Sequence, residues 1–262
     1  MCSGSLSEAA LRFAESLDTE DIGVVAECLY RYNSLGVDAS WEHRFRDLEA
    51  VRHELTRGFD EALQAQLSEH WFEVQPTEIP GWLIWQRRLG GAECGGSGRK
   101  LKLYVSPAPE SLAPAFRALV EVLSGVGSQS FKVGSTAANL LRPDKMVAYF
   151  SDLAELSKAA HELPRRLEGV PAQGVPFTSE ITPDGLLSWA MDPSPGGALS
   201  NRGPMSWRGW ICAQLAVALV EARMDPDNDL PAWQLALDRL SLQGIDVQRW
   251  LPRSTTWSGE GR

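Results

Sequence analysis

Residues Lys100-Leu-Lys-Leu-Tyr-Val-Ser106 decide the class of fold, because their apolar and polar side chains alternate. Leu101, Leu103 and Val105 fall on one side of an extended chain, and the basic side chains fall on the other. This period of two residues predicts a half-buried β-strand. The stretch therefore places at least one sheet in the protein and gives it one basic face.

Short strands and helices alternate around this stretch. Strands are predicted over residues 82–89, 130–133, 146–150, 175–179 and 186–191. Helices are predicted over residues 112–123, 152–167 and 207–223 and from residue 231 onward. Such alternation favours an α+β or α/β core. We predict an α+β fold, in which a mixed β-sheet core is flanked by helices.

The first third of the chain is predicted to be helical and acidic. Apolar residues recur at helical spacing over residues 6–17, 24–29 and 48–67. Residues 1–78 hold 16 acidic and 6 basic residues, although the whole chain of 262 residues has a net charge of −9. We predict an N-terminal helical segment over residues 1–78, an α+β core over residues 79–252 and a flexible tail over residues 253–262.

Composition and charge exclude several classes of protein. A chain of this length with 44% hydrophobic residues can bury a large core, unlike a disordered or collagen-like chain. The acidic balance makes duplex nucleic acid a poor partner. The longest apolar run, residues 210–220, is too short to span a membrane. With no signal-peptide pattern and no paired cysteine spacing, the expected location is the cytoplasm.

No common nucleotide or metal motif is present. The glycine-rich tract over residues 90–98 lacks the GK[ST] of a phosphate-binding loop and leads into a strand instead of a helix. It is interpreted as a hairpin loop. The cysteines and histidines show no zinc spacing. The chain is therefore expected to need no metal or organic cofactor.

Basic residues gather on and beside the predicted strands. Five of them and one acid lie between residues 86 and 103, and Lys132 lies within an apolar strand. Basic side chains on neighbouring strands can converge on one anion, usually a phosphate. The more common alternative is that they solvate one face of a sheet, and spacing alone leaves both interpretations open. The candidate anion-binding residues are Arg87, Arg99, Lys100, Arg142, Lys145 and Arg208.

The order of short motifs resembles the HopA-type effector family. The resemblance runs from the strand at residues 100–106 through Phe131-Lys-Val133, Arg142-Pro-Asp144 and Val147-Ala-Tyr-Phe150. It also covers the Leu29-Tyr30, 175–178, 191–193 and 212–219 segments. Proteins similar to this family accompany peptide-modifying kinases in class V lanthipeptide and thioamitide biosynthesis. The pattern is distantly similar to phosphothreonine lyases and to the lyase domains of class III and IV lanthipeptide synthetases.

This resemblance implies elimination of phosphate from a phosphorylated Ser or Thr, giving dehydroalanine or dehydrobutyrine. The implied partners are a phosphorylated precursor peptide and a separate Ser/Thr kinase that produces it. Such chemistry needs a base for the Cα proton, cations for the departing phosphate and support for charge on the carbonyl. By position, Lys132 matches the base, Arg142 a phosphate-binding arginine, and Lys100 and Lys102 the strand that faces the phosphate. Tyr149 is expected to orient the substrate.

Two positions depart from the family pattern. Phosphothreonine lyases place a histidine general acid where this chain has Lys102, which leaves the proton donor open. Basic residues are expected at the start of the helix at 207–223, but this chain has Trp210-Ile-Cys-Ala there. Arg202 or Arg208 would have to take the place of those basic residues. These departures leave two alternatives to an enzyme: a non-catalytic scaffold that binds the precursor peptide, and an effector that acts on a host partner.

Overall fold

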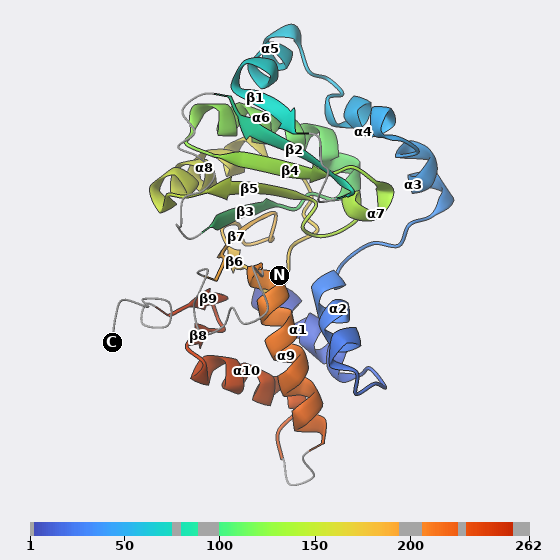
Figure 1. Cartoon of the computed structure of the whole chain (residues 1–262), viewed down its shortest axis with the longest axis vertical. Coiled ribbons are helices and arrows are strands. Elements are labelled where there is room, and N and C mark those ends of the chain that lie inside the picture. The colour runs from blue at the N-terminus through green and yellow to red at the C-terminus, as the bar shows by residue number, and fades with distance from the viewer. Residues whose placement is uncertain (1–2, 75–79, 89–99, 194–205, 225–228, 254–262) are drawn as a thin grey trace.

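The computed structural model describes residues 3–74, 80–88, 100–193, 206–224 and 229–253 (Figure 1). Its longer helices are α1 (Ser3–Glu15), α2 (Ile22–Arg31), α4 (Leu48–Leu55), α5 (Glu61–His70), α6 (Leu112–Gly125), α8 (Leu153–Arg166), α9 (Trp207–Arg223) and α10 (Ala232–Leu242). Two short helices, α3 (Ala39–Arg44) and α7 (Ala137–Leu140), and the 3-10 turn η1 (Pro109–Ser111) complete the helical elements of these residues.

Seven strands form one sheet in the order β1-β2-β4-β5-β3-β7-β6. They are β1 (Trp71–Val74), β2 (Trp82–Arg87), β3 (Leu101–Val105), β4 (Ser130–Gly134), β5 (Met146–Phe150), β6 (Ser179–Glu180) and β7 (Leu187–Met191). Strands β8 (Ile245–Asp246) and β9 (Leu251–Pro252) pair with each other. The α+β class is confirmed. The prediction of a mixed sheet is wrong, because each strand pair between described residues is antiparallel.

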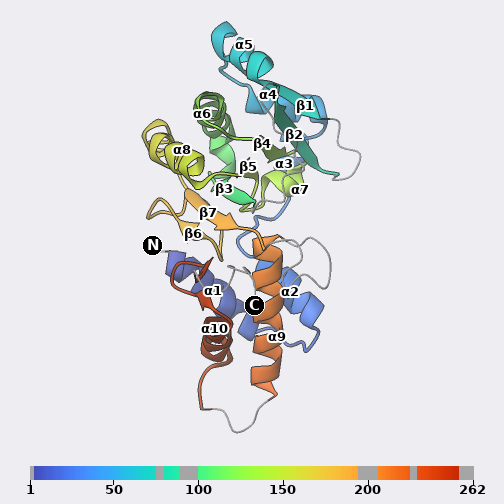
Figure 2. The same ribbon diagram turned by 60° about the vertical axis from the view of Figure 1, so that its left-hand side comes forward.

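The two faces of the sheet pack against different helices (Figure 2). On one face, termed the core face, Leu83, Trp85 and Phe131 pack with residues of α4, α5, α6 and α8. On the other, termed the site face, Tyr104, Val147 and Ala190 pack with residues of α1, α2, α9 and α10. Alternation along each strand divides the side chains in this way, because successive residues point to opposite faces. Each face therefore has its own hydrophobic core.

The second helical group lies at the β7–β6 end of the sheet in both views (Figures 1 and 2). Its centre is α9, which begins where the Ser206 side chain accepts a hydrogen bond from the Gly209 amide. Helices α2 and α10 both pack along α9. The last turn of α2 and the first turn of α9 therefore meet near the sheet.

Two local predictions need correction, and one strand was missed. The helix predicted over residues 48–67 is two helices, because Gly58 between α4 and α5 has a φ of +81°. The strand predicted over residues 175–179 is reduced to β6, since Phe177 has a φ of 62° and cannot continue an extended chain. Strand β1 was not predicted. It joins residues 71–74 to the sheet by pairing with β2. The predicted boundaries of the α+β core, at residues 78 and 252, stay predictions.

Candidate active site

Strand register places Lys132 and Lys102 on the site face of the sheet. Lys132 of β4 lies across from Ile84 of β2 and Val147 of β5. Lys102 of β3 lies across from Tyr149 of β5. Paired residues in antiparallel strands point to the same face, so these side chains lie opposite the core formed under α6 and α8. The two predicted catalytic lysines and Tyr149 are therefore on one surface of the sheet.

A buried carboxylate, Asp144, gathers three further side chains beside these strands. Arg142 donates from Nε to Oδ1 at 2.8 Å and from Nη2 to Oδ2 at 2.9 Å. Arg208 of α9 brings Nη1 within 3.0 Å of Oδ2, and the Tyr30 hydroxyl of α2 donates to Oδ2 at 3.4 Å. We call these four residues the Asp144 cluster. It joins α2, α9 and the turn before β5.

Charge in the Asp144 cluster keeps its carboxylate ionised. Burial by itself would raise the pKa of Asp144, but the Arg208 charge and the Arg142 hydrogen bonds outweigh it and lower that pKa to about 2. Arg208 and Asp144 are 1% and 5% exposed, whereas Tyr30 and Arg142 are only half-buried. Tyr30 and Arg142 are therefore the more exposed members of the cluster, and the Arg142 side chain is 13% exposed.

Two aromatic rings each contact two cations of the site. The Tyr30 ring centroid is 4.6 Å from the guanidinium carbon of Arg208 and 5.2 Å from that of Arg142. The Trp82 ring centroid is 5.6 Å from the guanidinium carbon of Arg142 and 3.8 Å from the Lys132 ammonium. Aromatic faces stabilise cations at such distances. Contacts through these two rings thus connect the predicted base to both arginines.

Lys132 is the cation best suited to act as a base. Its pKa is lowered to about 8, chiefly by burial and further by the charges of Lys102 and Arg142, although Asp144 opposes the shift. Among the described residues Lys132 forms no ion pair, whereas Lys102, Arg142 and Arg208 each pair with a carboxylate. With a pKa of about 8, roughly a tenth of Lys132 is neutral at pH 7. That neutral fraction can accept a proton.

Lys102 is paired with an acid that lies at the end of β7. Its ammonium lies 2.7 Å from Asp192 Oδ2 and 5.8 Å from the Tyr149 ring centroid. Asp192 Oδ1 also accepts a hydrogen bond from the Trp207 amide at 2.8 Å, which ties this pair to the start of α9. Burial, Asp192 and Asp144 together raise the pKa of Tyr149, so its phenol stays protonated.

The assembled site carries an excess of positive charge. Lys102, Lys132, Arg142 and Arg208 are its cations, and Asp144 and Asp192 are its described carboxylates. The surplus is therefore about two charges when Lys132 is protonated. A phosphate monoester dianion would neutralise this surplus.

Two predicted anion-binding residues serve backbone carbonyls instead. Arg87 is on the core face, where it donates to the carbonyls of Ser128 and Leu123 at 2.9 and 2.6 Å and also to that of Val126. Lys145 is fully buried and donates to the Pro107 carbonyl at 2.7 Å and to the Gln173 side chain. Burial lowers the pKa of Lys145 to about 7. Both cations anchor connecting segments.

The structure places the remaining predicted residues as follows. Lys100 is exposed just before β3, where its carbonyl accepts from the Asp192 amide at 2.9 Å. Arg99 and Arg202 lie outside the described residues. The structure thus brings together Lys102, Lys132, Arg142, Tyr149 and Arg208.

Sequence reasoning missed four members of this site. Tyr30, Trp82, Asp144 and Asp192 were not among the predicted site residues, although all but Trp82 lie within the motifs that carried the family resemblance. The Arg142-Pro-Asp144 spacing was a usable signal, because an arginine and a carboxylate two residues apart can pair across a turn. No local signal connects Tyr30 or Trp82 to Arg142.

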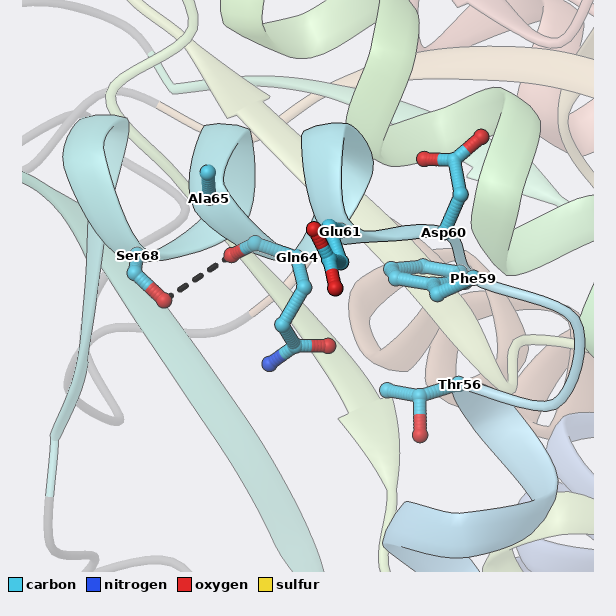
Figure 3. Close-up of a pocket in the computed structure, with 7 residues that line it drawn as sticks. All are labelled: Thr56, Phe59, Asp60, Glu61, Gln64, Ala65 and Ser68. Atoms are coloured by element: carbon cyan, nitrogen blue, oxygen red, sulfur yellow. Dashed lines mark hydrogen bonds between the residues drawn. The ribbon is translucent and has the colours of Figure 1, made fainter.

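A shallow hollow of about 450 Å³ lies elsewhere, along α5 and the loop that precedes it (Figure 3). Thr56, Phe59 and Gln64 are among its lining residues, and none of the predicted site residues lines it. Within the part of the chain that the structure describes, no group of three or more His, Cys, Asp or Glu side chains is placed to hold a metal ion. No helix of that part is long and apolar enough to cross a membrane.

Comparison with known proteins shows a shared fold. No protein-family model and no curated protein sequence matches the chain. The effector protein from Pseudomonas syringae pv. tomato strain DC3000 superposes with a TM-score of 0.55 at 16% identity, covering 97% of this chain and 98% of its own. The fold of that effector is therefore the fold of this chain over nearly its whole length. The predicted resemblance to an effector family is confirmed at this level.

Two further solved structures show weaker likenesses. The effector protein from Pseudomonas syringae pv. syringae strain 61 has a TM-score of 0.47 at 18% identity, covering 96% of this chain and 97% of its own. The type III effector and phosphothreonine lyase OspF from Shigella flexneri has a TM-score of 0.37 at 12% identity, covering 56% of this chain and 89% of its own. The chemistry of this chain must therefore be argued from its own side chains.

Proposed function

We propose that this protein eliminates phosphate from phosphorylated Ser or Thr in a peptide, leaving dehydroalanine or dehydrobutyrine. The observation that carries the proposal is Lys132, a lysine with a pKa of about 8 and no carboxylate partner among the described residues. It contacts the same Trp82 ring as Arg142, an arginine suited to phosphate. A base and a phosphate site are thus adjacent, as β-elimination requires.

The proposed reaction follows from this arrangement. Neutral Lys132 removes the Cα proton, the electron pair forms the Cα–Cβ double bond, and the Cβ–O bond breaks to release phosphate. Arg142 binds the phosphate oxygens, and the buried charges of Arg208 and Lys102 stabilise the developing anion. The reaction requires only proton transfer and electrostatic stabilisation, so the proposal includes no metal or organic cofactor.

The proposed substrate is a ribosomal precursor peptide that a separate Ser/Thr kinase phosphorylates in the cytoplasm. This part rests on the sequence resemblance to proteins of class V lanthipeptide and thioamitide biosynthesis. The surplus of positive charge at the site supports a phosphorylated peptide over an unmodified one.

A direct test compares wild-type protein with Lys132→Ala on a synthetic phosphoserine peptide. Mass spectrometry should show loss of phosphoric acid with wild-type protein and none with the variant, while circular dichroism shows that both are folded. Lys158→Ala is a matched control, because Lys158 is exposed on α8 and pairs only with Glu155. Full activity of Lys132→Ala would refute the proposed role of this lysine.

A non-catalytic alternative is favoured by the Lys102–Asp192 ion pair. A lysine held at 2.7 Å by a carboxylate is a poor replacement for a histidine acid. The protein would then bind a phosphopeptide and present it to other enzymes, or act as an effector on a host partner. Saturable binding of the phosphoserine peptide without loss of phosphate by wild-type protein would support this alternative over the lyase.

A further inference from the structure

The proposed elimination lacks an assigned proton donor. A phosphate monoester dianion that leaves unprotonated would depart as a trianion, which is a strongly basic and therefore poor leaving group. Lys102 stands at the position of the family's acid, but its ammonium is committed to Asp192 at 2.7 Å. A second donor close to Arg142 would resolve this difficulty.

We propose that the hydroxyl of Tyr30 is the acid that protonates the bridging oxygen of the departing phosphate. The inference rests on the proposed lyase function and adds a catalytic residue to it. Tyr30 comes from α2, more than a hundred residues before Lys132 in the chain. The helical group beside the sheet would then supply part of the chemistry.

The geometry of the Asp144 cluster places Tyr30 beside Arg142, the proposed phosphate-binding residue. The Tyr30 ring contacts both Arg142 and Arg208, with guanidinium carbons 5.2 and 4.6 Å from its centroid. Its hydroxyl reaches Asp144 Oδ2 at 3.4 Å, which is a long and weak hydrogen bond. The phenol proton is thus loosely held, and a phosphate bound to Arg142 would offer it a stronger acceptor.

Exposure agrees with this role. Arg208 and Asp144 are buried, whereas Tyr30 and Arg142 are half-buried and adjacent. A phosphate that approaches Arg142 therefore also approaches Tyr30. Tyr149 is the other half-buried tyrosine of the site, but its ring faces Lys102 and not Arg142, the proposed phosphate-binding residue.

The surrounding charges keep the phenol protonated until it is needed. Burial and Asp144 raise the pKa of Tyr30, against the opposing effects of Arg208 and Arg142. Tyr104 of β3 is a further titratable group in its surroundings. The Tyr30 proton is therefore present at neutral pH. It can move to the phosphate when the Cβ–O bond breaks, because fully deprotonated phosphate is a stronger base than a phenolate.

The step balances in protons and charge. Lys132 gains the Cα proton and becomes an ammonium, while Tyr30 loses its proton and becomes a phenolate. Phosphate leaves as the hydrogen phosphate dianion with the electron pair of the Cβ–O bond. Proton transfer from the Lys132 ammonium to the Tyr30 phenolate, through solvent, restores both groups.

The test uses full-length protein and two peptides that differ only in the leaving group, phosphoserine and O-sulfoserine. Sulfate is a weak base that leaves without a proton, so its elimination needs Lys132 but no acid. Tyr30→Phe keeps the ring and removes only the hydroxyl. It should reduce phosphoserine elimination by about 100-fold or more, as expected for loss of a general acid. Elimination of O-sulfoserine by this variant should stay close to the wild-type rate.

Tyr32→Phe is the matched control. Tyr32 follows the same helix, and its ring packs against Phe13 instead of an arginine. This variant should leave both rates unchanged. Lys132→Ala should abolish both reactions, because both need the base.

The outcomes separate the two proposals. Equal losses on both peptides would reduce Tyr30 to a positioning residue and overturn the inference, as would a wild-type rate of Tyr30→Phe on phosphoserine. Absence of phosphoserine elimination by wild-type protein would instead overturn the lyase proposal. If wild-type protein does not process O-sulfoserine, the pH profile of phosphoserine elimination decides. An alkaline decline present in wild-type protein must then be missing from Tyr30→Phe, and its persistence refutes the role.

Discussion

Replacement of Asp144 by asparagine tests whether one buried carboxylate holds the site together. Arg142 donates two hydrogen bonds to Asp144, and Arg208 lies 3.0 Å from it. Asparagine has nearly the same shape but no charge. The variant would therefore leave two arginines, one of them fully buried, without their shared anion.

The expected loss of stability follows from the pKa of this carboxyl. Asp144 has a pKa of about 2 in the folded protein against a reference value of 3.8. That difference corresponds to about 2 kcal/mol of stabilisation at pH 7. Removal of one partner from a buried ion pair typically costs about 3–5 kcal/mol, because the remaining charge is uncompensated. We therefore expect the free energy of unfolding to fall by about 2–5 kcal/mol.

Urea unfolding at several pH values is the assay. Because the folded pKa is depressed, the stabilisation by Asp144 is complete above the unfolded pKa and is lost as pH falls from about 5 toward 2. The difference in the free energy of unfolding between wild-type protein and Asp144→Asn should be largest at neutral pH and should become smaller in acid. Asp18→Asn, at an exposed position with no described ion pair, is the control and should show no gap.

Inorganic phosphate provides a second readout. The freed arginines of Asp144→Asn can bind it, so phosphate should raise the urea midpoint of the variant more than that of wild-type protein. Equal stability of the two proteins at pH 7, or a gap that does not change with pH, would refute the assignment of Asp144 as the shared anion.

Two other predictions concern the pH dependence of the reaction and the role of Arg87. The kcat/KM for phosphoserine elimination should rise with pH through about 8, because Lys132 must lose its proton to act as a base; a rate that is flat across this range would contradict the assignment. Arg87→Ala should lower the free energy of unfolding by about 1–3 kcal/mol, because it removes the donor to the Leu123, Val126 and Ser128 carbonyls. The elimination rate of that variant should be unchanged, and Arg165→Ala, at an exposed position, should alter neither quantity. A slower reaction without loss of stability would place Arg87 in substrate binding.

Some elements follow directly from local sequence. The strands β2, β3, β4 and β5 were predictable because alternating or continuous apolar side chains are bounded by loops. The helices α6, α8 and α9 follow from apolar residues at helical spacing. Errors came where one residue changes the backbone. Gly58 and Phe177 both have positive φ values, and that of Phe177 has no signal in residue type.

Predictability of the site was limited by strand register and chain topology. Lys132 stands out because a lysine within an apolar strand is unusual, and Arg142 stands out beside Asp144. Arg87 was predicted to bind an anion because it belongs to the basic group between residues 86 and 103, yet it lies across from Trp71 on the core face. Alternation along β2 decides this, because Arg87 is two residues from Trp85 and shares its face. Tyr30 and Arg208 meet Asp144 because α2 packs along α9, and no local pattern records that contact.

The sequence by itself determined the α+β class and most of the central strands, because these depend on neighbours within a few residues. The tertiary structure decided which cations share a surface, which are already neutralised by carboxylates and which remain available to an anion. The physical reason is that charges interact through space. The pKa of Lys132 depends on burial and on the charges of Lys102, Arg142 and Asp144. The antiparallel sheet and the turn before β5 bring these groups together.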